Sequence, residues 1–137
     1  MTKTTRKEKP EIVLPPITVK EDEARRLNAL ARSSAMLFPR VAHFLAQEIE
    51  RASVVTDNSD LRGVVRMGSQ VRYSDDKTGE VRDVVLVYPH EADITLKRVS
   101  VLTPVGAALI GLSVGQAIEF RTPGDNKRCV TVLGVSS

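Results

Sequence analysis

Four acids that lie close together in the chain are the residues best suited to chemistry: Asp75, Asp76, Glu80 and Asp83. Carboxylates at this spacing could hold a divalent cation or act as a general acid and base pair. A solvated hairpin explains them better, because an aspartate in a turn accepts hydrogen bonds from its own backbone. Bases interspersed among the acids neutralise the rest of their charge: Arg72, Lys77 and Arg82. We therefore expect no metal site in this stretch.

Other residue types that catalyse reactions do not form a site in the sequence. His43 and His90 lie far apart, and no pair of cysteines has the spacing of zinc ligands. His43 is expected on a helix surface, and the single Cys129 is expected to be a small core side chain. Ser100 has no base near it in the sequence, which favours a packed or backbone-bonded serine over a nucleophile. We expect no enzymatic activity, no cofactor and no small-molecule substrate.

The composition describes a globular protein with a basic N-terminal segment. A chain of 137 residues suffices for one compact domain with an appendage, and 42% hydrophobic and 27% charged residues are ordinary values. The net charge of +3 resides in residues 1–20, so the rest of the chain is neutral. That segment has no aromatic residue for stacking on nucleic acid, and a solvated terminus is the simpler interpretation. No secretion signal or membrane span is expected, and the predicted location is cytoplasmic.

Two helices are predicted in the first half of the chain. Residues 18–21 (Thr-Val-Lys-Glu) have the spacing of a capping box, so a first helix is expected from about Val19 to Ser33. Pro39 suits the first turn of a second helix, which carries a strong apolar stripe and ends near Ser53. Together they predict an antiparallel hairpin with arms of about 20 Å. Because arms of this length are marginal alone, amide exchange is expected to be faster in the hairpin than in the later strands.

The second half of the chain has the composition of strands. Five strand segments are expected, at residues 64–73, 80–88, 99–102, 115–121 and 128–135. Residues 80–88 carry valine at both odd and even positions, so apolar side chains would point to both faces of a strand. This favours a central strand covered on both faces. Residues 75–79 suit a hairpin turn, Pro123-Gly124 suits a type II turn, and a loop is expected between the second and third strands.

Residues 99–111 combine a short strand, a capped helix start and a helix stop. Thr103 followed by Pro104 is typical of an N-cap with proline at the first helical position. Gly111 is the expected stop. A helix this short is not stable alone in water, so it must be held by burying its apolar side chains against neighbouring strands: Val105, Leu109 and Ile110.

The second half resembles a known family. The residues that carry the resemblance are Thr78-Gly79-Glu80, Pro89-His90-Glu91-Ala92-Asp93, Pro104-Val105-Gly106-Ala107-Ala108-Leu109-Ile110-Gly111, Gly115 and Thr122-Pro123-Gly124. They resemble the C-terminal domain of the Gre transcript-cleavage factors (the GreA/GreB C-terminal domain), and are closer still to the Rnk branch, the regulators of nucleoside diphosphate kinase. The resemblance covers roughly residues 10 to 135 and is looser before the C-terminal half.

The resemblance implies an α+β fold. A short N-terminal antiparallel helical hairpin would precede an FKBP-like, mostly antiparallel sheet with one short helix. The expected division is a basic, proline-rich lead-in at 1–17, the hairpin at 18–55, a linker at 56–63 and the Gre-like domain at 64–137.

The resemblance also implies a function. Gre-type factors bind RNA polymerase at the entrance of its secondary channel, and the positions that match their contact segment are Ser100, Leu102, Thr103 and Pro104. Gre factors tend to carry an acid where this chain has Leu102, so the contact can differ, although leucine is usual in the Rnk branch. A regulator of this kind reaches DNA and RNA only through the polymerase. It is expected to act as a monomer, away from membranes.

The tip of the predicted hairpin departs from the Gre pattern. In Gre factors a longer hairpin carries acids that help to hold a catalytic magnesium ion, whereas residues 33–39 here contain no acid. We therefore expect competition with Gre-type factors and no transcript cleavage. Met36, Leu37 and Phe38 either form an exposed apolar contact or fold back over the hairpin end, and the second interpretation is the simpler one.

The sequence leaves a second function open. The protein could instead be a protein–protein adaptor that regulates nucleoside diphosphate kinase or another soluble enzyme without touching polymerase. Only the identity of the bound protein separates the two hypotheses.

Overall fold

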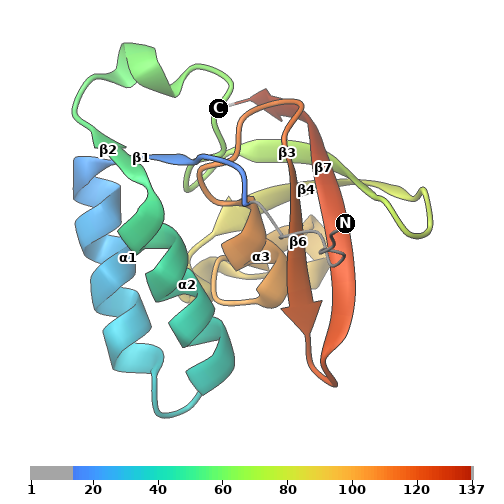
Figure 1. Cartoon of the computed structure of the whole chain (residues 1–137), viewed down its shortest axis with the longest axis horizontal. Coiled ribbons are helices and arrows are strands. Elements are labelled where there is room, and N and C mark those ends of the chain that lie inside the picture. Colours follow the sequence, from blue (N-terminus) through green and yellow to red (C-terminus); the bar gives the residue numbers. More distant parts are fainter. Residues whose placement is uncertain (1–13, 137) are drawn as a thin grey trace, which may run out of the picture.

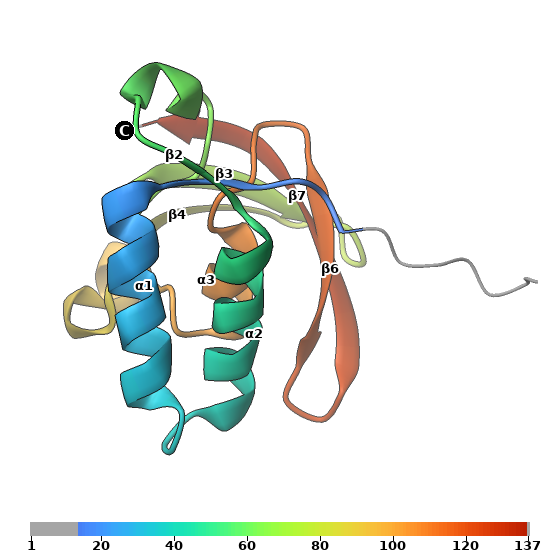
Figure 2. The same cartoon turned by 60° about the vertical axis from the view of Figure 1, so that its left-hand side comes forward.

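A helical hairpin, a short inner helix and a curled sheet make up the protein (Figure 1). The computed structural model describes residues 14–136, so most of the basic lead-in predicted at 1–17 lies outside the described residues. The hairpin helices α1 (Glu21–Ser34) and α2 (Pro39–Arg51) cover one side of α3 (Pro104–Leu109), and the sheet curls around the other side (Figures 1 and 2). This arrangement confirms the predicted α+β fold.

The sheet has five strands in the order β5-β4-β3-β7-β6. Neighbouring strands are antiparallel except β4 and β5, which are parallel. The strands are β3 (Gln70–Asp75), β4 (Val81–Val87), β5 (Arg98–Ser100), β6 (Ala117–Thr122) and β7 (Asn126–Ser136). Short 3-10 turns occupy the connections, at η2 (Asn58–Leu61), η3 (Pro89–Glu91) and η4 (Ile94–Leu96).

The start of the hairpin differs from the prediction. Thr18 does not cap a helix; it begins a strand, β1 (Thr18–Lys20), which pairs in parallel with β2 (Ser53–Val55). The strand buries Val19 to 3% exposure, which a helical first turn facing solvent would not achieve. Helix α1 then begins at Glu21 and has no side-chain cap. The acidic residues of its first turn stabilise it instead, because their negative charge interacts favourably with the positive end of the helix dipole.

The predicted apolar stripes of the two helices are confirmed, except that Phe38, before the second helix, is 52% exposed. Leu27 and Leu45 are fully buried, and other residues of the same stripes are also buried: Ala24, Ala31, Ala42 and Ile49. Most of these side chains belong to one hydrophobic cluster that continues through α3 and the inner face of the sheet. The hairpin is therefore packed on the sheet domain and shares its core.

Two strand predictions need correction. Strand β4 is covered on both faces only at its C-terminal end, where the adjacent residues Leu86 and Val87 are both buried, whereas its first three residues, from Val81, are exposed. Strand β5 begins and ends earlier than expected, at Arg98–Ser100, because Leu102 already belongs to the turn into α3.

No helix among residues 14–136 combines the length and apolar character that a membrane crossing requires.

Candidate functional site

The turn from β5 into α3 is held by side-chain hydrogen bonds. We call residues 100–104 the corner. The hydroxyl of Ser100 accepts a hydrogen bond from the backbone N–H of Leu102 at 2.9 Å. The Thr103 hydroxyl donates to the Ser100 carbonyl at 2.7 Å and accepts from the Gly106 N–H at 3.1 Å. The predicted N-cap at Thr103 is confirmed, with Pro104 at the first helical position.

Close packing of the helix on the strand end makes the corner rigid. Gly106 is buried, and a Cβ atom added there would lie 2.9 Å from the Cα of Val101 and closer still to the Ser100 carbonyl oxygen. Only glycine leaves room for this approach. The expected anchors of α3 are present, because Leu109 and Ile110 are buried and Val105 is half-buried.

The four predicted contact residues do not present equal surfaces. Leu102, Thr103 and Pro104 are half-buried, whereas Ser100 is 8% exposed and its hydroxyl is engaged with the backbone. The structure therefore brings all four into one turn, in which Ser100 shapes the backbone and the other three offer the accessible surface. Ser100 is the backbone-bonded serine that the sequence suggested.

Tyr88, which sequence reasoning missed as a site residue, lies next to the corner and is contacted by Arg26. The Val101 N–H donates to the Val87 carbonyl at 2.8 Å, which places Tyr88 beside the corner. The guanidinium of Arg26, from α1, lies 4.7 Å from the centre of the Tyr88 ring. The His90 ring stacks on the Tyr88 ring, with 6.5 Å between the two ring centres. Burial raises the pKa of the Tyr88 hydroxyl above its ordinary value. No signal in the sequence could have paired Arg26 with Tyr88, because they lie in separate halves of the chain.

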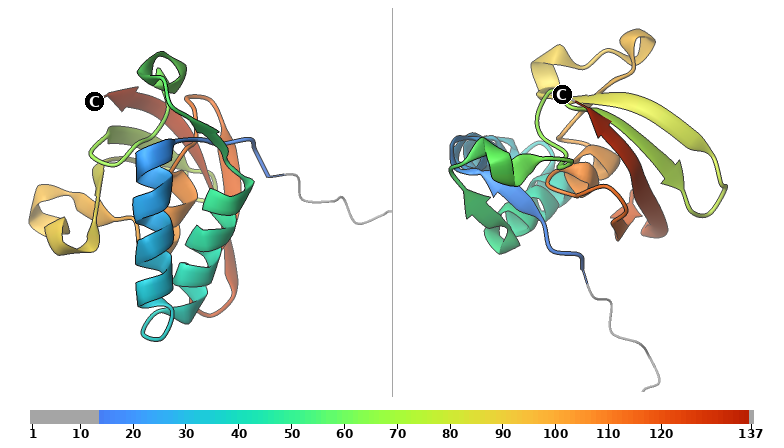
Figure 3. Two further views of the ribbon diagram at one scale, coloured as in Figure 1. Left: turned by 90° about the vertical axis from the view of Figure 1, so that its left-hand side faces the viewer. Right: turned by 90° about the horizontal axis from the view of Figure 1, so that it is seen from above.

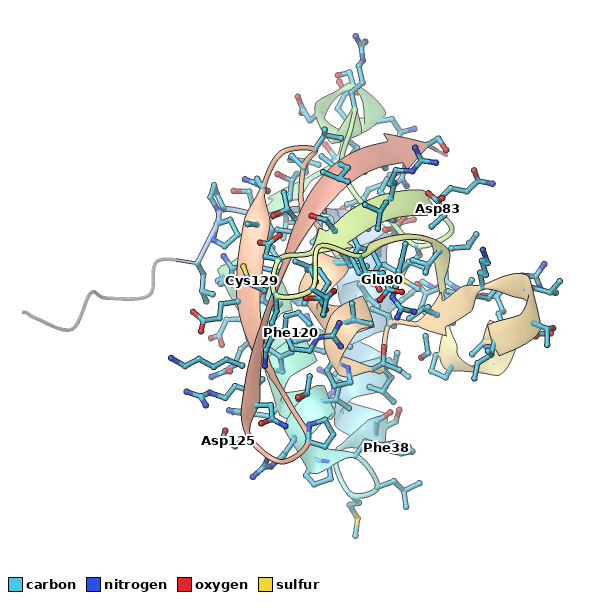
Figure 4. The ribbon with its side chains drawn as sticks, turned by 90° about the vertical axis from the view of Figure 1, so that its right-hand side faces the viewer. Phe38, Glu80, Asp83, Phe120, Asp125 and Cys129 are labelled. Atoms are coloured by element: carbon cyan, nitrogen blue, oxygen red, sulfur yellow. The ribbon has the colours of Figure 1, made fainter. Side chains whose placement is uncertain are left out.

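The hairpin tip is exposed. Met36, Leu37 and Phe38 are 94%, 79% and 52% exposed, so the interpretation that they fold back over the hairpin end is wrong. Phe38 lies at the free end of the hairpin in Figure 4. No acid occurs between Ala31 and Gln47, so the whole tip lacks a carboxylate. The tip projects beyond α3 at the end opposite β1 and β2 (Figure 2). This is also the end at which α3 begins, because Gly111, which follows α3, bonds to Thr18 of β1 at the other end.

The four acids of the β3–β4 hairpin are engaged in structural contacts. Asp75 accepts hydrogen bonds from the backbone of residues 77 and 78, as expected of an aspartate in a turn. Contrary to the prediction it is not solvated, since it is 6% exposed and receives a 2.6 Å bond from Arg128. Arg128 and these amides hold the pKa of Asp75 below its ordinary value.

The remaining chemistry-bearing side chains are similarly occupied. Exposed ion pairs join Asp83 to Arg72 and Glu80 to Arg82, and both acids are visible in Figure 4. Within residues 14–136, no group of three or more His, Cys, Asp or Glu residues is arranged to hold a metal ion. Cys129 is half-buried rather than in the core, and burial raises the pKa of its thiol to about 11, so it is protonated at neutral pH.

Comparison with known proteins assigns both halves of the chain. Residues 59–137 match the family model described as the C-terminal domain of the transcription elongation factors GreA/GreB, and residues 15–55 match that of the Rnk N-terminus. The regulator of nucleoside diphosphate kinase from Escherichia coli K12 is 36% identical over 110 residues, which are 80% of this chain and 81% of that protein.

Gre factors are similar over a shorter stretch of sequence. Transcription elongation factor GreA from Rhodospirillum rubrum is 39% identical over 82 residues, or 59% of this chain and 52% of that protein. The solved structure of a prokaryotic transcription elongation factor GreA/GreB from Nitrosomonas europaea is 34% identical and superposes with a TM-score of 0.69, covering 90% of this chain and 99% of that one.

The rigid corner thus lies in a domain of the GreA/GreB type, and the short acid-free hairpin lies in the segment matched by the Rnk N-terminus. The chain belongs to the Rnk family, whose C-terminal domain is that of the GreA/GreB transcription elongation factors.

Proposed function

We propose that this protein is a transcription regulator that binds RNA polymerase at the entrance of its secondary channel and does not stimulate transcript cleavage. The observation that carries the proposal is the corner, a rigid and partly exposed turn in a domain of the GreA/GreB type. A surface that is already ordered loses little conformational entropy when a partner binds. Leu102, Thr103 and Pro104 supply the contact, and Ser100 holds them in place.

The composition of the tip is the reason why we propose no cleavage activity. A cleavage factor must deliver a carboxylate to the polymerase active centre, because hard cations such as Mg²⁺ take oxygen ligands and the ion must hold the attacking water. Residues 32–46 offer exposed apolar and basic side chains instead. The arms of 14 and 13 residues are about 20 Å long, short for a hairpin that must reach that centre.

A backtracked elongation complex tests the proposal directly. Alone, the protein should produce no transcript cleavage, and in excess it should slow the cleavage that a Gre factor induces. Cleavage by this protein alone would contradict the absence of activity. Undiminished Gre action at saturating excess would contradict binding at the shared entrance.

Variants at the two surfaces show which of them makes the contact. Leu102→Lys should weaken capture of purified RNA polymerase, because it places a positive charge in a half-buried apolar position of the corner, where Gre factors tend to carry an acid. Met36→Ser should weaken capture only if the tip also touches polymerase. Ile94→Ser is the matched control, since Ile94 is 93% exposed in η4. If Leu102→Lys binds as tightly as wild type and remains folded by circular dichroism, the corner is not the contact.

The name of the Escherichia coli relative, regulator of nucleoside diphosphate kinase, motivates a parallel assay with purified nucleoside diphosphate kinase. Capture of the kinase without capture of polymerase would replace the proposed function with the adaptor hypothesis. Capture of polymerase alone would make any effect on the kinase indirect.

A further inference from the structure

The outer face of the hairpin, on the side away from α3, carries a groove that the proposed function does not use. The groove has a volume of about 620 Å³, and all of its lining residues belong to α1, α2 or their connection. Its apolar floor includes Ala31 and Ala42, which are buried, and Ala46, which is half-buried. Figure 3 (left) shows both helices in front of α3 with no other element covering them.

Charges of opposite sign line the two ends of this groove. Arg32 lies in the last turn of α1, beside the tip, and Glu50 lies in the last turn of α2, beside β2. Both are exposed, and neither forms an ion pair with another residue in the range 14–136. At 1.5 Å per residue the two side chains are separated by about 15 Å along the hairpin.

We propose that this face binds a second copy of the chain, with the two hairpins antiparallel in a four-helix bundle. A two-fold axis near the middle of the groove, perpendicular to the helices, brings Arg32 of one copy and Glu50 of the partner subunit to the same end of the groove, across its width, and the reverse pair forms at the other end. A surface that matches itself in this way is what an isologous dimer requires. The small floor residues let the helices of the two copies approach closely.

The size of the face sets the strength of the dimer. Two helices about 10 Å wide and 20 Å long present about 400 Å² per copy, which is below the area of a stable interface. The dimer is therefore weak and reversible, and its formation depends on concentration. The paired charges fix the antiparallel orientation more than they add affinity. The proposed dimer is independent of polymerase binding, because it rests only on the groove and its two charges. Its test likewise contains no polymerase.

Sedimentation equilibrium of the full chain, from low micromolar to several hundred micromolar at low salt, tests the dimer. The wild type should associate. Arg32→Glu and Glu50→Arg should each weaken association about tenfold or more, because each places like charges opposite one another at both ends. The double variant Arg32→Glu/Glu50→Arg should restore association, since it regenerates both pairs with reversed sign.

The control is Arg62→Glu, which makes the same charge change at an exposed position of the connection, outside the groove. It should associate as the wild type does. A wild type that stays monomeric throughout the range overturns the proposal. So does association that the single variants leave unchanged or that the double variant fails to restore, which would indicate another surface. Because Arg32 and Glu50 are exposed, circular dichroism should show all variants folded.

Discussion

The corner between β5 and α3 depends on one residue without a side chain. Thr103 caps the helix and Pro104 starts it, but both would be useless if α3 could not lie against the end of β5. Gly106 allows that approach, because the backbone of Ser100 and Val101 fills the space where a Cβ would be. A helix of 6 residues has little stability of its own, so its place is set by this contact and by the burial of Leu109.

Gly106→Ala should lower the free energy of unfolding by at least about 2 kcal/mol, because the added methyl group forces the helix away from the strand. Urea denaturation followed by circular dichroism measures the change. Gly134→Ala is the matched control, since a Cβ there meets nothing closer than 4.0 Å and its stability should stay within about 0.5 kcal/mol of wild type. Equal effects of the two substitutions would contradict the role assigned to Gly106.

Asp75 should make the stability of the protein depend on pH. Its pKa in the folded state lies below the ordinary value of 3.8, chiefly because Arg128 donates a hydrogen bond to the carboxylate. A lowered pKa contributes stability that is fully present above the unfolded pKa and is lost as the pH falls through the folded one. The stability difference between wild type and Asp75→Asn should therefore be largest above about pH 4 and shrink below it.

Urea midpoints measured from neutral pH down into the acid range test this expectation. Asp83→Asn is the control, because Asp83 pairs with Arg72 on an exposed surface and should contribute less at every pH. A stability difference for Asp75→Asn that does not vary with pH would mean that its charge is not what stabilises the fold.

At the scale of elements, the position of the hairpin is fixed where it meets the sheet. Glu23, on α1, is 8% exposed and forms a 2.9 Å ion pair with Arg66, which precedes β3. Strand β1 adds backbone bonds, since the Thr18 N–H donates to the Gly111 carbonyl at 3.1 Å. Gly111 has a positive φ of 80° and would place a Cβ against Ile17, so glycine is needed both to stop α3 and to admit β1. These contacts orient the hairpin relative to the corner.

Glu23→Ala should cost about 1–3 kcal/mol of unfolding free energy, because it leaves the partly buried guanidinium of Arg66 without its partner. Glu21→Ala on the same helix is the control: Glu21 and Arg25 form an exposed pair at 3.7 Å, and its loss should be nearly neutral. Chemical denaturation of both variants decides the matter. Comparable losses would indicate that helix α1 itself, and not its junction with the sheet, had been weakened.

At the scale of the whole molecule, one core joins the hairpin to the sheet. Leu27 and Leu45 of the hairpin belong to the same buried cluster as Leu109 of α3 and Val130 of the sheet. Arms of 14 and 13 residues are marginal alone, so the hairpin depends on this cluster for its stability. The sequence-based expectation of a less protected hairpin rested on arms that pack only on each other, and they do not.

We therefore expect the hairpin and the sheet to unfold together. Native-state amide exchange should show the same maximal opening free energy in α2 as in β7, whereas the exposed connection at 89–97 should exchange faster. A hairpin that opens at a clearly lower free energy than β7 would mean that the shared core does not couple the two halves.

Local patterns in the sequence determined the elements that depend on near neighbours. Thr103-Pro104 predicts the start of α3, and the stripes around Leu27 and Leu45 predict the two helices, because capping and helical periodicity involve residues within a few positions of each other. The absence of acids from the tip is also evident from the sequence alone. It is the basis for the expectation that the tip does not hold a catalytic metal. The family resemblance supplied the order of the parts.

Only the tertiary structure decided features that depend on distant partners. The sequence of residues 18–20 predicts a helix cap, yet these residues form β1. They do so because β2 pairs with them and because Val19 is buried in the core. From the sequence, Asp75 is expected to be a solvated turn residue. In the fold, Arg128, on β7, lies beside it and donates a hydrogen bond to its carboxylate. The outer groove likewise exists only once α1 and α2 are side by side. In each case the stabilising free energy comes from contacts between segments far apart in the chain, and a local sequence pattern cannot predict such contacts.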